Sequence, residues 1–181
     1  LVVAAAGEEQ IGALPDTLAR FPPEQVLWAG PPSGTSSARK LQQWLAKESI
    51  PVMQAQSGQA LDLGQDARLH VLSASSHGAV LLLEWGNFRA LLPVGLDFSA
   101  MEQLLSDANQ GPLSVLLLAQ SGYGPLNPPE WITRWQPQVI LLSVGAGDFD
   151  GRPQAETLAA IQGYTVLRTD KNGWIEITTD G

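Results

Sequence analysis

Five carboxylates stand where the loops of an α/β protein often carry chemistry. Each follows a segment that the sequence predicts to be a strand, and the five are Glu8, Glu9, Asp97, Asp148 and Asp150. Carboxylate oxygens are the ligands that Mg²⁺ and Mn²⁺ prefer, so these residues could form an oxygen-rich metal site if their loops converge. They could equally be solvated surface charges, which a chain of net charge −8 is expected to carry. The sequence leaves both interpretations open.

Nucleophilic catalysis has weaker candidates. Ser121, in the stretch AQSGYG, follows a predicted strand as the serine of a nucleophile elbow does, but that motif needs glycine where Ala119 and Tyr123 stand. A catalytic triad also needs a histidine, and the chain has only His70 and His77, which are both expected to be structural or solvated. With two histidines and no cysteine, the sequence predicts neither a thiolate site nor a histidine-rich metal centre.

Two glycine-rich segments match nucleotide-binding loops only in part. In SVGAGDFDG the third glycine, Gly151, comes one residue too late, and Arg152–Pro153 separates it from the next predicted helix. The stretch GPPSGTSSARK lacks the Gly-Lys-Ser/Thr order of a P-loop. The first segment is therefore predicted to be a tight turn and the second a loop with a helix cap at Ser36 or Ser37, and no cofactor is expected.

The charge balance counts against a nucleic-acid surface. Ten Lys and Arg stand against 18 Asp and Glu, and the resulting negative charge repels phosphate backbones and acidic membranes. The basic residues form isolated pairs, Arg39 with Lys40 and Arg168 with Lys171, rather than a stripe. No apolar run reaches the ~18 residues of a membrane helix, and no signal peptide is visible. The composition is that of an ordered globular chain, without cysteines and hence without disulfides.

The elements that must position these residues begin with buried strands. Continuous apolar runs predict them, and two pairs are predicted to be hairpins, one turning at Gly86–Asn87 and the other at Asn172–Gly173. The predicted strands cover residues 1–3, 25–28, 79–84, 88–92, 114–118, 139–144, 164–168 and 174–178.

Helices are predicted between the strands from amphipathic spacing and capping residues. They are a helix over 37–47, one that starts at the capping-box pattern from Ser99 to Glu102, one capped by Asn127, and one over 153–162. Strands that alternate with helices, together with hairpins, predict an α/β sandwich of mixed sheets. No repeat or linker divides the chain, so a single domain over residues 1–181 is expected.

In this order and spacing, the landmarks of the sequence resemble a known family. They are LVV followed by QIGALPDTLARFPPEQVLWAG, then IPVMQAQSGQALDLG, AVLLLEWGNFRALLPVGLD, PLSVLLLAQSGYG and PQVILLSVGAGDFDGRPQAETLAAIQGYTVLRTDKNGWIEI. The chain resembles the metallo-β-lactamase-like domain at the C-terminal end of ComEC-type competence proteins, the channels for DNA uptake in bacteria. The resemblance covers nearly the whole chain and is tightest from Pro137 to Ile177.

The resemblance implies αββα layers with the site at one edge of the sandwich. The family begins with strands ahead of the one that starts here at Leu1, so the chain is expected to lack the first strands and to be a fragment of a larger membrane protein. It is then expected on the outer side of the bacterial cytoplasmic membrane, with the channel portion of the same parent protein as its partner.

The resemblance does not extend to the family's metal ligands. The family's first metal loop, Thr-His-x-Asp-x-Asp-His-Ile-Gly-Gly, falls on 4–13, its His-His-Gly-Ser falls on 120–123, and its His-Pro-His falls on 152–154. Its bridging aspartate falls on Gly95. The vestigial metal-site positions implied by the resemblance are Ala5, Gly7, Glu9, Gln10, Gly95, Gln120, Ser121, Arg152 and Gln154. Glu9 alone keeps a carboxylate, so neither a bound metal nor a catalytic residue is expected.

Three hypotheses follow. The leading one is a catalytically inactive metallo-β-lactamase-like domain of a ComEC-like competence protein, with a structural or interaction role and no cofactor. The alternative is a metal-dependent nuclease that acts on incoming DNA through a rearranged site drawn from the five carboxylates. The third is a passive guide for DNA, which the acidic balance disfavours. We expect the positions of the carboxylates in the fold to separate the hypotheses.

Overall fold

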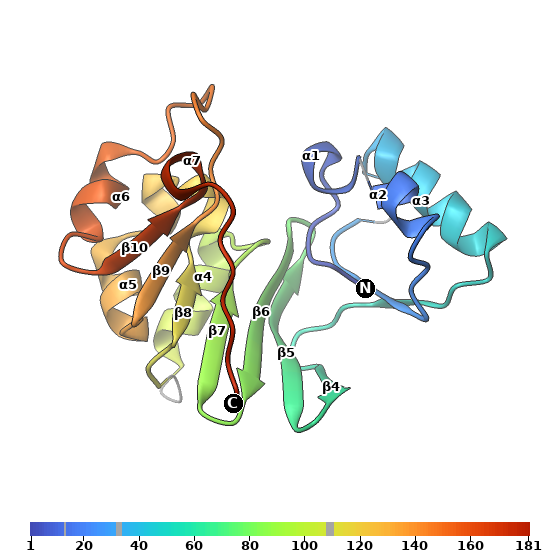
Figure 1. Cartoon of the computed structure of the whole chain (residues 1–181), viewed down its shortest axis with the longest axis horizontal. Helices are drawn as coiled ribbons and strands as arrows, with labels where there is room; N and C mark the ends of the chain where they lie inside the picture. The colour runs from blue at the N-terminus through green and yellow to red at the C-terminus, as the bar shows by residue number, and fades with distance from the viewer. Residues whose placement is uncertain (13, 32–33, 108–110) are drawn as a thin grey trace.

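Four layers build the protein in the computed structural model, which describes residues 1–12, 14–31, 34–107 and 111–181 (Figure 1). Two sheets stack on each other, and helices cover the outer face of each. Residues 1–55 supply the small sheet and its helices, and the rest of the chain supplies the large sheet and its helices. The prediction of an α/β protein with a mixed sheet is confirmed.

The large sheet has the strand order β10-β9-β8-β7-β6-β5-β4 in the described residues. Strands β7 to β10 run parallel, and strands β4 to β7 are antiparallel neighbours. The small sheet, β1-β2-β3, is wholly parallel, so only the large sheet is mixed. The strands are β1 Val2–Val3, β2 Val26–Trp28, β3 Val52–Gln54, β4 Ala60–Gly64, β5 Ala67–Ser75, β6 Gly78–Trp85, β7 Phe88–Leu92, β8 Val115–Leu117, β9 Val139–Leu142 and β10 Thr165–Arg168.

The helices follow the strands whose outer faces they cover. Helices α1 to α3 lie against the small sheet, and α4, α5 and α6 lie against the large sheet (Figure 1). The helices are α1 Glu8–Ile11, α2 Leu14–Leu18, α3 Ser36–Lys47, α4 Phe98–Ser106, α5 Pro129–Trp135, α6 Ala155–Ala160 and α7 Thr169–Asn172, with the 3₁₀ turns η1 Ala119–Ser121 and η2 Gly124–Leu126.

The alternation of side chains along each strand separates the cores. In β6, Val80 and Leu82 point to the helices, whereas Leu81 points to the small sheet. The same holds in β2, where Trp28 packs under α3 and Leu27 packs between the sheets. A strand buried on both faces reads as a continuous apolar run, which is why these strands could be predicted.

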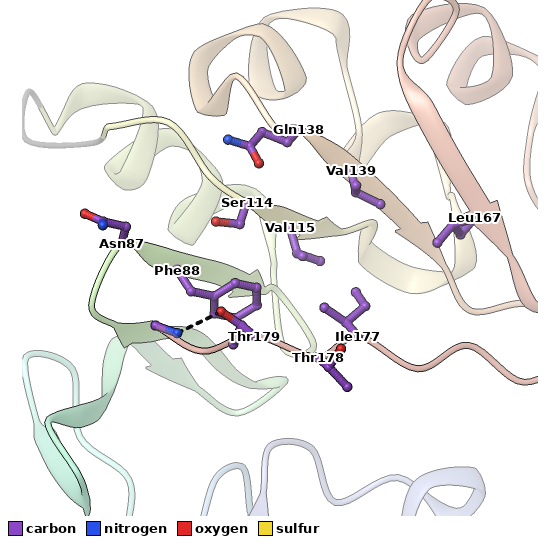
Figure 2. A pocket seen from close by; sticks show the side chains of 11 residues that line it. Asn87, Phe88, Ser114, Val115, Gln138, Val139, Leu167, Ile177, Thr178 and Thr179 are labelled. Atoms are coloured by element: carbon purple, nitrogen blue, oxygen red, sulfur yellow. Dashed lines mark hydrogen bonds between the residues drawn. The ribbon is translucent and has the colours of Figure 1, made fainter.

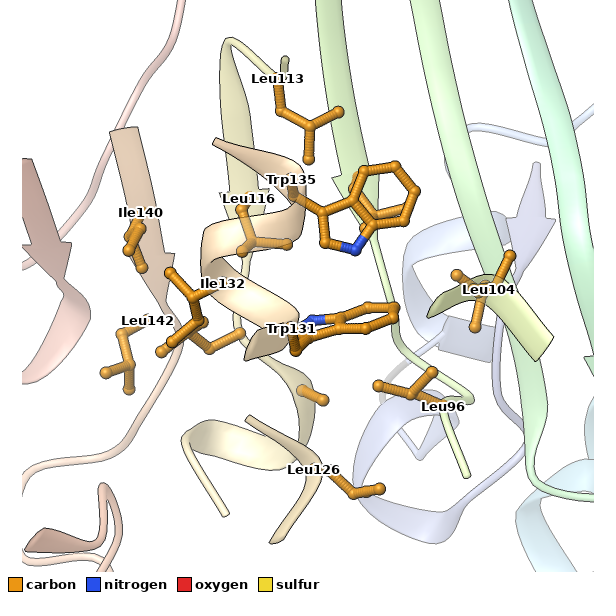
Figure 3. Packing of buried hydrophobic residues seen from close by; sticks show 14 of the residues in the cluster. Leu96, Leu104, Leu113, Leu116, Leu126, Trp131, Ile132, Trp135, Ile140 and Leu142 are labelled. Atoms are coloured by element: carbon orange, nitrogen blue, oxygen red, sulfur yellow. The ribbon is translucent and has the colours of Figure 1, made fainter. Parts of the chain in front are cut away.

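The largest core lies between the large sheet and helices α4 to α6 (Figure 3). Trp131 and Trp135 of α5 are fully buried in it and meet edge to face, with ring centroids 5.5 Å apart. Leu116 of β8 and Ile140 of β9 complete the contact with the sheet. Aromatic pairs in this geometry add to the stabilisation from their buried area.

The small sheet covers only part of the large one. From the large sheet, the core between the sheets takes residues of β4 to β7 and none of its buried members from β8 to β10, and it is completed by Leu27, Ala29 and Ala55 of the small sheet and its loops. Over the inner face of β8 to β10 lies the extended C-terminal segment 173–181 (Figure 1). This half of the inner face is therefore covered by a single irregular segment.

The hairpin predicted at the C-terminus is wrong, whereas the one at Gly86–Asn87 is confirmed. Strand β10 pairs in parallel with β9, and the chain then forms the short helix α7. Asn172 closes that turn, because its Oδ1 accepts the N–H of Arg168 at 2.8 Å, and Thr169 binds back to Val144. Residues 174–178 form no strand.

The predicted helix caps are also wrong in detail. Asp97, two residues before Ser99, caps α4, and Thr35 rather than Ser36 or Ser37 caps α3. Asn127 is not the N-cap of α5, which is Pro128; its amide is buried in the loop after β8 instead. The N-cap is the residue at which the backbone changes from extended to helical, and the local sequence pattern alone does not determine where that change occurs.

No helix within the described ranges is long and apolar enough to cross a bilayer.

Candidate functional site

A cavity of about 450 Å³ lies where the carboxyl ends of the parallel strands meet. It is bounded by the loops that follow β1, β7, β8 and β9 and by the turn between β5 and β6. In α/β sheets this edge is the usual place for ligands. The lining residues are Ala5, Gly7, Gln10, His77, Pro93, Val94, Gly95, Leu96, Leu117, Leu118, Gln120, Ser121, Ser143 and Arg152.

Most of the positions predicted from the resemblance lie around this cavity. The structure brings together Ala5, Gly7, Gln10, Gly95, Gln120, Ser121 and Arg152. Gln154 lies outside the lining, because its Oε1 accepts the N–H of Gly124 at 2.7 Å and so holds the loop after β8. The side chain of Glu9 lies outside what the structure describes. Residues far apart in the sequence thus form one pocket, and His77 and Ser143 join it without having been predicted.

A close crossing of two backbones forms one wall of the pocket. The N–H of Ala79 donates to Ala4 at 2.7 Å, and the N–H of Gly95 donates to Ala79 at 2.9 Å. A Cβ on Gly95 would lie closer than 3.0 Å to main-chain atoms of Gly78 and Ala79, a distance that real Cβ atoms essentially never show. Gly78, at φ +128°, is as crowded, against Ala4. Position 95 therefore admits glycine alone in this backbone.

The opposite wall is a left-handed run of the chain. Gln120, Ser121 and Gly122 all have positive φ, at 43°, 55° and 84°. Non-glycine residues adopt this conformation at a cost unless their surroundings enforce it. Here the buried side chain of Thr157 donates to the carbonyl of Gly122 at 2.8 Å, and the amide of Asn127 binds main-chain groups on both sides of the run.

Arg152 supplies the positive charge of the pocket. Its guanidinium lies 5.7 Å from the centroid of the Tyr123 ring, and its two terminal nitrogens lie 3.1 Å from Asp150 Oδ2 and 3.4 Å from the carbonyl oxygen of Gln120. These contacts fix a side chain that is otherwise flexible. At this position, where the resembling family has a metal-ligating histidine, the chain has a cation.

Glu8 points away from the pocket. Its carboxylate lies at the N-terminus of α3, where it accepts hydrogen bonds from the hydroxyl of Ser37, from the Ser37 N–H at 3.3 Å and from the Ser36 hydroxyl at 3.3 Å. The hydrogen bonds from Ser37 hold the pKa of Glu8 below its usual range. A carboxylate in this place satisfies free N–H groups and complements the helix dipole, so Glu8 has a role in the fold.

Asp97 and the pair Asp148 and Asp150 also have partners of their own. Asp97 accepts the N–H of Ala100 at 2.8 Å and lies 3.3 Å from His77 Nδ1. Asp148 accepts the N–H of Arg152 at 3.0 Å, and Asp150 pairs with the Arg152 guanidinium. In the part of the chain that the structure describes, no three acidic, histidine or cysteine side chains come together as metal ligands.

Asp97 makes a pH-dependent contribution to stability that can be measured. The hydrogen bond from Ala100 lowers its pKa, so the unfolded chain binds a proton more readily than the folded one. This contribution is present above the unfolded pKa of about 3.9 and is lost as the pH falls through the lower, folded value. We expect Asp97→Ala to cost about 1 kcal/mol near neutral pH and less in acid.

Urea denaturation of the variant at neutral and acidic pH measures this change. Asp97→Asn is the matched control, because asparagine keeps the cap but has no proton to titrate. It should stay near the wild-type stability at neutral pH. An equal loss for Asp97→Ala at both pH values would contradict the assignment.

A second cavity, of about 410 Å³, lies under the C-terminal segment (Figure 2). Phe88, Val115, Val139 and Leu167 form its floor on β7 to β10, and Ile177 faces them from the segment. Sequence reasoning missed this cavity, because it placed residues 174–178 in a strand of the sheet.

Comparison with known proteins assigns no family: no protein-family model matches the chain, and no curated protein matches it significantly.

Proposed function

We propose that this chain is a catalytically inactive metallo-β-lactamase-like domain of a ComEC-like competence protein, with a structural or interaction role beside the channel part of its parent protein. In this proposal the domain lies on the outer side of the bacterial cytoplasmic membrane. The resemblance of the sequence motivates the family, and the pocket chemistry motivates the loss of activity.

The composition of the pocket lining is the observation that carries the proposal. None of the fourteen lining residues of the described pocket has a carboxylate, and His77 is the one imidazole among them. That imidazole lies against Asp97, at 3.3 Å. A catalytic zinc needs about three protein ligands and an open position for water, and activation of that water depends on the ion. These side chains are a poor donor set for such a centre.

Exposed apolar side chains support the interaction role. Trp174 is 84% exposed and Ile177 is 40% exposed, and both belong to the C-terminal segment over the inner face of β8 to β10. Covering the exposed Trp174 ring with a partner would remove apolar surface from water, which favours association.

Metal analysis of the purified protein tests the proposal. After incubation with Zn²⁺ or Mn²⁺ and removal of free ions, we expect far less than one ion per chain. The reason is that amide, hydroxyl and guanidinium groups bind these cations poorly. One or two tightly held ions per chain would overturn the proposal.

Nuclease assays of the same samples provide the functional control. Single-stranded and double-stranded DNA should survive with excess Mn²⁺ or Mg²⁺, while circular dichroism shows that the fold is intact. Metal-dependent cleavage that is lost in Asp150→Asn would favour the rearranged carboxylate site instead.

A further inference from the structure

The pocket that lacks metal ligands still has a polar lining. The side chains of Gln10, Gln120, Ser121 and Ser143 have no hydrogen-bond partner within the described part of the chain, and Arg152 adds its guanidinium. Amides and hydroxyls both donate and accept, whereas the guanidinium only donates. Such a lining suits a ligand that brings acceptor oxygens and at least one further polar group.

Arg152 is already bound to a carboxylate. Its contact with Asp150, at 3.1 Å, involves one of the five N–H donors that a guanidinium carries, and its contact with Gln120, at 3.4 Å, involves another. The side chain of Asp150 is 68% exposed, whereas that of Arg152 is 27% exposed. An ion pair with one well-exposed partner is weak, so a second carboxylate can replace Asp150 at little cost.

We propose that this pocket binds a small organic carboxylate, which pairs with Arg152 in exchange for Asp150 and donates to or accepts from the neighbouring amides and hydroxyls. The planar fork of a guanidinium matches a carboxylate with two parallel hydrogen bonds. The cavity volume of about 450 Å³ lies in the range of small-molecule pockets.

The surrounding charges favour a singly charged ligand. Asp148 and Asp150 lie in the same loop as Arg152, and the chain as a whole is acidic. A phosphate group near neutral pH carries about −1.5 to −2 charges, which scale both its attraction to Arg152 and its repulsion by the two aspartates. Because the loop has two carboxylates and one guanidinium, the larger ligand charge is on balance unfavourable. The pocket therefore discriminates against phosphate and accepts a monocarboxylate.

Calorimetric titration with N-acetylglycine tests this site. The probe has one carboxylate and one amide, and we expect a dissociation constant on the order of 1 mM. EDTA is kept in all samples, so the result does not depend on metal content and is separate from the test of the inactive domain. N-acetylglycinamide, the uncharged analogue, and inorganic phosphate are the matched probes, and both should bind much more weakly.

Three variants locate the site. Arg152→Gln should weaken binding at least about tenfold, because it removes charged hydrogen bonds to the ligand. Asp150→Asn should bind about 2- to 5-fold more tightly, since it removes the competing carboxylate. Arg168→Gln is the control: Arg168 is also paired with an aspartate, Asp170, but lies outside the pocket lining, so binding should not change.

Several results would overturn the proposal. They are the absence of binding to the folded wild type, equal binding of the uncharged analogue, tighter binding of phosphate, and an unchanged affinity in Asp150→Asn. Amide spectra of each variant, recorded beforehand, establish that the fold is retained.

Discussion

Replacing Gly95 by aspartate should destabilise the fold by about 3 kcal/mol or more instead of creating a metal site. Aspartate is the residue that the resembling family has at this position. Any Cβ here would collide with main-chain atoms of Gly78 and Ala79, which cannot rotate away as a side chain can. The crossing is also held by the hydrogen bonds from Ala79 to Ala4 and from Gly95 to Ala79.

Urea denaturation measures the effect, with Gly95→Ala as the smaller substitution. Because the clash begins at the Cβ, alanine should cause most of the loss. Gly145→Ala is the matched control: a Cβ there meets nothing within 4 Å, so stability should change by less than about 0.5 kcal/mol. A stable Gly95→Asp protein that binds metal would show that the crossing can open.

Asn127→Ala should cost about 3 kcal/mol, although the residue does not line the pocket and is not the N-cap of an α-helix. Asn127 is 1% exposed. The Oδ1 atom accepts the N–H of Ala119 at 2.9 Å, and the Nδ2 group donates to the carbonyls of Ala119 and Tyr123 at 3.0 and 2.7 Å. Alanine would leave the buried N–H of Ala119 without a partner, which costs more than a lost bond. The carbonyls of Ala119 and Tyr123 would keep only their bonds from the N–H groups of Gly122 and Leu126.

Chemical denaturation and amide hydrogen exchange across residues 119–124 check this result. Thr157→Val is the smaller comparison, because it removes one of two bonds to the Gly122 carbonyl, which also accepts the N–H of Gln154 at 3.1 Å, and it should cost about 1 kcal/mol. Both variants should increase exchange at Gly122 and Tyr123. A loss below about 0.5 kcal/mol for Asn127→Ala would mean that water takes over the role of the amide.

Long apolar runs allowed much of the sheet to be predicted from the sequence. Predictions from local patterns were wrong where the side chain makes a different hydrogen bond in the fold. Strand β6 could be predicted because it is buried on both faces. Asn127 has the position of a helix cap in the sequence, but in the fold its amide is buried and binds main-chain groups of the loop after β8 instead. Asn172–Gly173 is a hairpin signal, yet the bond from Arg168 to Asn172 closes a helical turn first.

For the candidate site, the sequence predicted which positions come together but not which contacts their side chains make. The resemblance named Gln10, Gly95 and Gln120 as one site, and the structure places them around one cavity. Nothing local in the sequence indicates that Asp150 pairs with Arg152 or that Glu8 turns to α3. Such contacts depend on where loops meet, which hydrophobic periodicity does not encode.

The left-handed run at Gln120 and Ser121 has a consequence for how this protein could evolve. Asparagine, aspartate and histidine are the side chains that most readily accept this conformation after glycine. Hydrogen bonds from the side chains of Asn127 and Thr157 to main-chain carbonyls hold this backbone in place. Single substitutions at 120 and 121 could therefore bring new ligands to the pocket without changing its shape. Gly95 allows no such substitution, because a Cβ there would collide with main-chain atoms of Gly78 and Ala79. Substitutions can therefore add metal ligands on the wall formed by residues 120 and 121, whereas a ligand at position 95 would require the crossing of the two backbones to open.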